Sequence, residues 1–120
     1  EAIAFFKALW EADIERIAIE NPVGVMSSHI GKSTQIVQPY MFGDEATKTT
    51  CLWLKNLPLL TPTNIVGKGE RITFGSGKSM PKWYAEALSK AKTAEERRNL
   101  RSKTFKGMAK AMAEQWTIEE

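Results

Sequence analysis

The sequence predicts an α/β domain built around an open sheet. Residues 2–10 repeat apolar side chains at helical spacing, residues 16–19 form a short continuous apolar run, and that run stops at a Glu-Asn-Pro triplet. A helix leading into a strand covered on both faces is the repeating unit of such sheets. Ligands bind outside the carboxyl ends of the strands, so the triplet is the first candidate site.

The composition fits one domain, residues 1–120, because 42% hydrophobic content at this length can form a core. The longest apolar runs, such as Cys51 to Leu54, are far shorter than the roughly 20 residues of a membrane span. No basic-then-apolar signal segment opens the chain, so we predict a cytoplasmic protein without membrane contact. The chain starts without Met in a predicted helix, and we therefore expect a piece of a longer protein.

The first half predicts a helix and three strands. The opening helix ends near residues 11–13 and carries Phe5, Phe6, Leu9 and Trp10 on its apolar side. A strand follows at Arg16 to Ile19. Pro22 prevents it from continuing, since proline has no amide proton to donate to a neighbouring strand. A loop follows over residues 23–34. Further strands are predicted from Gln35 up to Pro39 and at 49–55, the second of them rich in β-formers, with a turn at 42–45 between them.

The second half predicts short strands and then helices. An irregular stretch over 58–69 precedes a short strand at 71–74 and a glycine loop at 75–78. A helix begins at Met80, and the charged stretch Lys90 to Arg101 has so little to bury that we expect it to be mobile. A closing helix carries apolar residues at i, i+3, i+4, i+7 and i+11, namely Phe105, Met108, Ala109, Met112 and Trp116.

The charge is unevenly distributed. Residues 1–65 carry five Lys/Arg against seven Asp/Glu, whereas residues 66–120 carry twelve against seven. A basic half favours a phosphate-bearing partner such as DNA, and solvated helix faces are the alternative explanation. The basic candidates on predicted loops and strand ends are Lys32, Lys48, Arg71 and Lys78.

The remaining motifs predict no phosphate-binding, catalytic or metal site. The Gly31-Lys32-Ser33 triplet lacks the first glycine of a phosphate loop, because Met26 stands there, and the later Gly-Lys-Ser has the same defect. Cys51 lies in a predicted buried strand, where an apolar environment makes a thiol unreactive. One cysteine and one histidine, His29, cannot assemble a zinc site, so we predict no metal.

The pair Glu20-Asn21 is the informative constellation. A carboxyl group and an amide at the carboxyl edge of a sheet are partly desolvated and can bind the edge of a heterocycle. The alternative is that both side chains cap the following segment.

Several ordered blocks resemble phage and prophage DNA cytosine methyltransferases over nearly the whole chain. They are Ile17-Ala-Ile-Glu-Asn-Pro-Val-Gly, Gln35-Ile-Val-Gln-Pro-Tyr-Met-Phe-Gly, Lys48-Thr-Thr-Cys-Leu-Trp-Leu-Lys-Asn-Leu-Pro, Pro62-Thr-Asn and Arg101-Ser-Lys-Thr-Phe-Lys-Gly-Met-Ala-Lys-Ala-Met-Ala-Glu-Gln-Trp. The resemblance implies part of a Rossmann-like, methyltransferase-like sheet with flanking helices. Pro22 replaces the valine that is common in the general enzymes, a departure shared with the phage group.

The resemblance also implies roles for the Glu-Asn pair. In that family the glutamate hydrogen-bonds N3 and the exocyclic amine of a flipped cytosine, which corresponds to Glu20 here, with Asn21 as its positioning partner. The basic candidates would contact phosphates. The family's S-adenosylmethionine turn and its Pro-Cys nucleophile belong to a segment upstream of this helix. We therefore expect this chain alone to bind no cofactor and to transfer no methyl group.

The chain is thus predicted to be the C-terminal portion of such a protein. The alternative is a remnant that binds nucleic acid or a protein partner without chemistry. A sheet lacking its first strands exposes an edge, and two apolar helix stripes need cover, so we also predict a homo-oligomer.

Overall fold

The computed structural model describes residues 2–22, 31–101 and 103–117; for residues 2, 3, 21, 22 and 101 it describes the backbone alone. The predicted loop after Pro22, including Met26 and His29, lies largely outside the described residues. The elements in chain order are α1 (Ala2–Glu11), β1 (Ile17–Pro22), β2 (Gln35–Val37), η1 (Pro39–Met41), β3 (Thr50–Lys55), β4 (Arg71–Thr73), β5 (Ser79–Pro81), α3 (Lys82–Lys90), α4 (Ala94–Arg101) and α5 (Lys106–Gln115).

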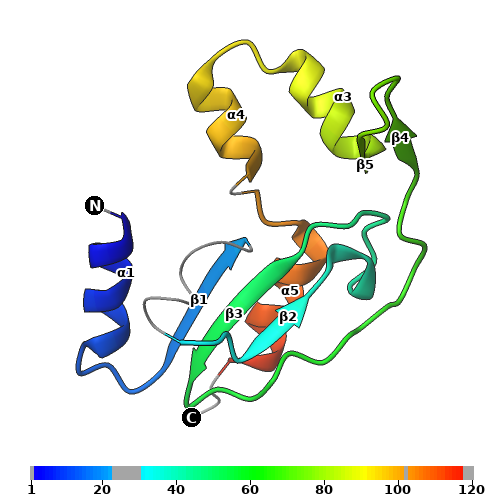
Figure 1. Cartoon of the computed structure of the whole chain (residues 1–120). Helices are drawn as coiled ribbons and strands as arrows, with labels where there is room; N and C mark the ends of the chain where they lie inside the picture. The colour runs from blue at the N-terminus through cyan, green and yellow to red at the C-terminus, as the bar shows by residue number, and fades with distance from the viewer. Residues whose placement is uncertain (1, 23–30, 102, 118–120) are drawn as a thin grey trace.

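These elements form two parts (Figure 1). The sheet body consists of the three-stranded sheet with α1 and α5, and comprises the described residues up to 66 and residues 106–117. The lobe comprises residues 70–101 and contains the β4–β5 hairpin, α3 and α4. The radius of gyration is 15.9 Å, larger than the value of about 14 Å expected for one compact domain of this length. Residues 103–105, called the strap below, lead from α4 to α5.

The strand pairing corrects the predicted sheet type. In the three-stranded sheet the order is β1-β3-β2, and β3 is antiparallel to both neighbours. The lobe contains a second, two-stranded antiparallel sheet. A Rossmann-like sheet is mostly parallel. The structure therefore confirms a mixed α/β domain but does not confirm a Rossmann-like fold.

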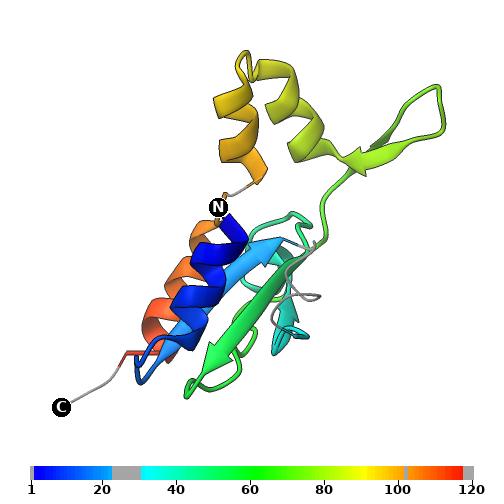
Figure 2. The same ribbon diagram turned by 60° about the vertical axis from the view of Figure 1, so that its left-hand side comes forward.

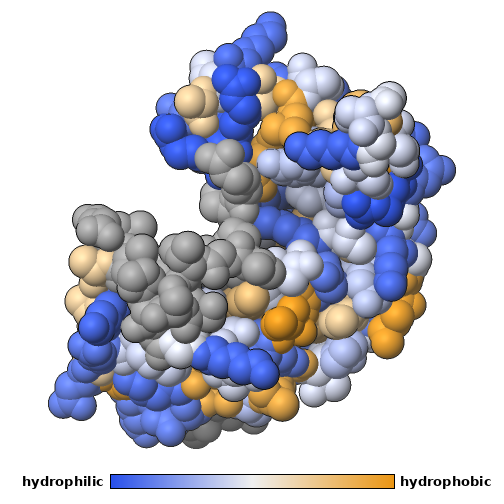
Figure 3. All heavy atoms as spheres, viewed as in Figure 1, coloured by the Kyte–Doolittle hydropathy of each residue, from blue (hydrophilic) through white to orange (hydrophobic). Residues whose placement is uncertain are grey.

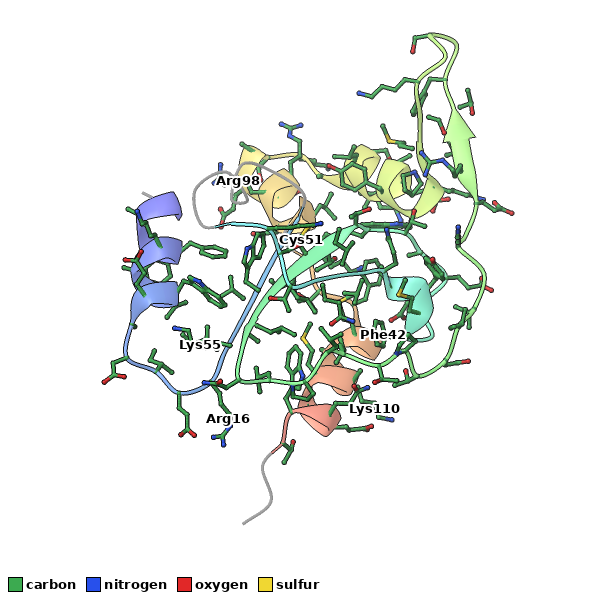
Figure 4. All side chains as sticks on the ribbon, turned by 60° about the horizontal axis from the view of Figure 1, so that its bottom comes forward. Arg16, Phe42, Cys51, Lys55, Arg98 and Lys110 are labelled. Atoms are coloured by element: carbon green, nitrogen blue, oxygen red, sulfur yellow. The ribbon has the colours of Figure 1, made fainter. Side chains whose placement is uncertain are left out.

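Strand β3 forms the centre of the core because both of its faces are covered. Leu52 and Leu54 belong to a cluster with Val37, Met108 and Ala111, on the α5 side. On the other face, Cys51 and Trp53 pack with Phe6 of α1. Side chains alternate between the faces of a strand, so burial of both faces explains why this strand is continuously apolar. Figure 4 places Cys51 and Lys55 toward opposite ends of β3.

Helix α5 approaches the body closely through Gly107. A Cβ atom added there would lie 2.0 Å from the carbonyl oxygen of Phe42, so only glycine fits. The Gly107 amide donates to Asp44 Oδ2 at 3.0 Å, which satisfies one of the unpaired donors in the first turn of the helix. Phe42 and Lys110 lie near one another beside α5 (Figure 4).

The structure differs from two sequence expectations, one in the lobe and one in the sheet body. In the lobe, residues 94–101 form helix α4, although their charge favoured a mobile stretch. The Glu96 amide donates to Thr93 Oγ1 at 3.1 Å, so Thr93 caps the helix, and Glu96 Oε2 accepts a hydrogen bond at 2.7 Å from the Lys92 amide.

In the sheet body, the strand predicted from Gln35 up to Pro39 ends at Val37. The chain continues as η1, because Pro39 begins a 3-10 turn.

The predicted apolar stripes find most of their cover inside one chain. Met108 is 2% exposed, and Met112 and Trp116 pack against the same cluster. Phe6 is buried, whereas Phe5 is 71% exposed and faces away. This corrects the premise that both stripes need a partner chain. Among the described residues, no helix is long and apolar enough to cross a membrane.

Candidate functional site

Glu20 lies inside β1, two residues before its carboxyl end, whereas the sequence placed it directly after a strand ending at Ile19. It pairs with Leu52 across the ladder, so its side chain shares the sheet face that α5 covers. There the hydroxyl of Thr104 donates to Glu20 Oε2 at 2.7 Å. Thr104 belongs to the strap, and the contact joins residues that are 84 positions apart. One oxygen of the Glu20 carboxyl group is therefore held in a defined position.

Lys48 is the predicted basic residue that the structure brings to Glu20. It lies two residues before β3, is half-buried, and donates from Nζ to the carbonyl oxygen of Lys103. Its backbone amide donates to Gln38 Oε1 at 2.7 Å, which fixes its position. Burial lowers the pKa of Lys48 below its ordinary value of 10.5, Glu20 raises it, and Lys103 lowers it further. Lys48 and Glu20 thus contact adjacent residues of the strap, Lys103 and Thr104.

An aromatic pair borders these charges. The rings of Trp83 and Phe105 meet edge to face, with centroids 5.0 Å apart. Trp83 Nε1 donates to the carbonyl oxygen of Thr47 at 3.1 Å, so this lobe residue contacts the chain segment beside Lys48. The Lys103 ammonium lies 4.8 Å from the centroid of the Phe105 ring, a distance typical of cation-π contact.

We call these residues the Glu20 cluster: Glu20, Lys48, Trp83, Lys103, Thr104 and Phe105. β1 points its carboxyl end toward the side of the molecule where α4 lies (Figure 1). The space-filling view shows an indentation of the molecular outline next to the lobe (Figure 3). A carboxyl group, two ammonium groups and aromatic rings suit a planar polar ring that carries a nearby negative charge.

The other predicted site residues do not join the cluster. The backbone of Asn21 pairs with Cys51, and its side chain lies outside the described residues. Lys32 is exposed before β2. Arg71 and Lys78 lie on the β4–β5 hairpin, which projects from the lobe away from the sheet body (Figure 2).

Four residues of the cluster were missed from the sequence as site residues. Lys103, Thr104 and Phe105 belong to the block Arg101-Ser-Lys-Thr-Phe, which is part of the resemblance. The resemblance implied no function for these three residues. Trp83 was assigned to the apolar side of a helix, and nothing in its spacing indicates the bond to Thr47. Contacts across 36 to 84 positions cannot be predicted from local pattern.

Cys51 and the glycine loop at 75–78 have the structural roles that the sequence predicted for them. Cys51 is 8% exposed and packs with Phe6 and Trp53, which confirms its place in the core. The glycine loop at 75–78 joins two strands, whereas a phosphate loop leads from a strand into a helix. Among the described residues, no group of three His, Cys, Asp or Glu is placed to hold a metal.

The part of the chain that the structure describes contains no glycine turn from a strand to a helix. Such a turn is what the resemblance implies for the S-adenosylmethionine site. Two described junctions lead from a strand to a helix, β2 to η1 through Gln38 and β5 directly to α3, and neither contains glycine. No step can therefore be assigned to the cofactor here, and the absence of binding by this chain stays a prediction.

Fold and site together define a mixed α/β domain with a half-buried carboxyl group beside basic and aromatic residues. Comparisons of the chain with protein-family models, with curated proteins and with solved structures found no match.

Proposed function

We propose that this chain is the C-terminal portion of a phage-type DNA cytosine methyltransferase-like protein, and that Glu20 binds the edge of a flipped cytosine. The observation that carries the proposal is the position of the Glu20 carboxyl group. It lies two residues before the carboxyl end of β1, with one oxygen held by Thr104 at 2.7 Å. This agrees with the role that the resemblance implies for the glutamate of the Glu-Asn pair.

The neighbours of Glu20 suit a nucleotide. A carboxylic acid can donate to N3 of cytosine and accept from its exocyclic amine, which makes the ring more susceptible to a nucleophile. Lys48 and Lys103 supply positive charge close by, as a phosphate requires. Trp83 and Phe105 offer ring surfaces of the kind on which unstacked bases pack.

In this proposal the parent reaction moves a methyl group from S-adenosylmethionine to the cytosine, in the cytoplasm of a phage host. The cofactor turn and the nucleophilic cysteine belong to an upstream segment, so this chain alone is inactive. The parent sheet would be Rossmann-like if upstream strands add to the outer edge of β1, which no described strand covers. Self-association of the isolated chain through this edge stays a prediction.

The alternative function is binding without chemistry. The basic C-terminal half and the hairpin residues Arg71 and Lys78 favour a nucleic-acid-binding remnant in which Glu20 has no contact with a base. Both functions predict DNA affinity that falls steeply with salt. Only the proposed one predicts that Glu20 distinguishes cytosine from other bases.

The test compares binding to two DNA duplexes that carry either cytosine or thymine opposite an abasic site, where the base leaves the stack easily. We expect the chain to prefer the cytosine duplex by roughly 5- to 150-fold, the discrimination typical of a good base-edge contact. Glu20→Ala should abolish the preference. Glu114→Ala is the matched control, because Glu114 is an exposed carboxylate on α5.

A preference that survives in Glu20→Ala would exclude Glu20 from base binding and leave the remnant as the better explanation. A preference lost in both variants would point to a general charge effect and would count equally against the proposal.

A further inference from the structure

The β4–β5 hairpin has one polar face. Arg71 pairs with Pro81, Ile72 with Met80, and Thr73 with Ser79. Ile72 and Met80 are half-buried, while Arg71, Thr73 and Ser79 are exposed. Arg71 Nε donates to Ser79 Oγ at 3.0 Å, which places both on the same side. The outer face of the ribbon is therefore a row of hydrogen-bonding groups.

The tip of the hairpin exposes an aromatic ring and a cation. The Phe74 amide donates to the carbonyl oxygen of Lys78 at 2.8 Å, and the Gly77 amide donates to that of Phe74 at 2.9 Å. Gly77 has a φ of 90°, which favours glycine and closes the turn tightly. Phe74 is 43% exposed at this tip. The hairpin projects beyond the rest of the lobe (Figure 2).

The hairpin and its flanks are basic. Residues 67–82 carry four Lys/Arg and one Asp/Glu. Lys82 lies 3.0 Å from the single acid, Glu70, so that charge is compensated at the base of the hairpin. Arg71 and Lys78 are exposed on the projecting part. A projecting cationic ribbon complements a polyanion better than it complements a neutral protein surface.

We infer that the β4–β5 hairpin enters the major groove of duplex DNA; DNA as the ligand rests on the function proposed above. The major groove is about 12 Å wide and admits a two-stranded β-ribbon. Arg71, Thr73 and Ser79 then face the base edges, Lys78 contacts a phosphate, and Phe74 packs against the apolar edges of the bases. The contact holds the duplex beside the lobe while Glu20 acts on a single base.

The experiment measures affinity for a mixed-sequence DNA duplex by fluorescence anisotropy over a salt series. Arg71→Gln and Phe74→Ala should each weaken binding about tenfold, as expected for a lost base contact. Lys78→Gln should lower the slope of log K against log salt by about 0.9, the value for one phosphate contact. The matched controls, Phe5→Ala on α1 and Lys110→Gln on α5, replace side chains that are also highly exposed and should leave binding unchanged.

The groove is identified with two further probes. A duplex containing glucosylated 5-hydroxymethylcytosine blocks the major groove and should lose binding, whereas netropsin fills the minor groove and should have no effect. A-form RNA duplexes should bind weakly, because side chains cannot reach into their deep, narrow major groove.

The inference is overturned if the hairpin variants bind like the controls, if netropsin competes while glucosylation does not, or if RNA duplexes bind equally well. These outcomes are independent of the cytosine preference. Hairpin variants should lose affinity and keep the preference, whereas Glu20→Ala should lose the preference and keep most of the affinity.

Discussion

The sheet body and the lobe have similar secondary structure but very different burial. Every buried hydrophobic residue among the described residues lies in the body, from Phe6 to Leu60 and again at Met108 and Ala111. The lobe has two helices and a hairpin, yet none of its described side chains is fully buried. Stability should therefore reside in the body, while the lobe can move at low cost.

The largest expected difference between the two parts concerns core truncation. Leu52 is 0% exposed at the centre of β3, so Leu52→Ala should lower the free energy of unfolding by about 2–5 kcal/mol. Leu88→Ala, in the half-buried lobe helix α3, removes the same atoms and should cost much less. Urea unfolding followed by circular dichroism measures both. Equal losses would contradict the assignment of stability to the body.

The second expected effect tests the close approach of α5 to the body. Gly107→Ala would place its Cβ 2.0 Å from a backbone oxygen, which cannot move aside cheaply, so we expect a loss of about 1–3 kcal/mol. In an exposed helix the same change would stabilise by up to about 1 kcal/mol, so the sign is informative. Gly75→Ala in the hairpin loop is the control, because nothing lies within 4 Å of its Cβ position. Differential scanning calorimetry records both changes.

The third effect tests how the lobe is attached. Trp83 joins it to the body through the hydrogen bond to Thr47 and to the strap through Phe105. In Trp83→Ala we expect about tenfold faster hydrogen exchange in α3 and α4, equivalent to about 1.4 kcal/mol, with no change in β3. The radius of gyration from small-angle scattering should exceed 15.9 Å. Uniformly faster exchange in both parts would show instead that the lobe and body unfold together.

The smallest effect concerns the titration of Lys48. Burial lowers its pKa in the folded state, so the folded chain releases this proton before the unfolded chain does. Stability should therefore rise with pH between the folded pKa and 10.5, and Lys48→Gln should flatten that rise. Because Glu20 raises the pKa of Lys48, Glu20→Ala should lower it further. Carbon-13 NMR of the lysine side chains against pH measures the shift, and an increase in Glu20→Ala would contradict the proximity of the two groups.

The same difference in burial explains which elements the sequence predicted. α1, β3 and α5 were predicted close to their observed bounds, because each presents an apolar pattern to the core. β1 was predicted to end at Ile19 and continues to Pro22, because its polar residues also pair with β3. α4 was missed because its eight residues have no apolar pattern and depend on the Thr93 cap and on the neighbouring helix α3. The end of β2 at Val37 was also missed, because the residues after it are compatible with either a strand or a turn.

The candidate site was predicted in part. Glu20 was identified from its predicted place after a strand, and Lys48 from its charge just before the strand predicted at 49–55. Their association depends on the β1–β3 register, which aligns the carboxyl end of one strand with the amino end of the other. Thr104 and Trp83 could not be predicted, because they reach the site only after the lobe and strap return to the sheet.

By itself the sequence determined the mixed α/β class, the continuously apolar central strand, the closing helix and the position of Glu20 in the carboxyl half of the first strand or just beyond it. These follow from local periodicity and turn chemistry, which act over a few residues. Only the tertiary structure decided that the strands pair antiparallel and that the sheet covers the apolar side of α5. It also decided that the strap residues 103–105 bring Thr104 to Glu20 and contact Lys48 and Trp83. The physical reason is that direction of pairing and long-range contact depend on how whole elements pack, and no short stretch of sequence encodes that.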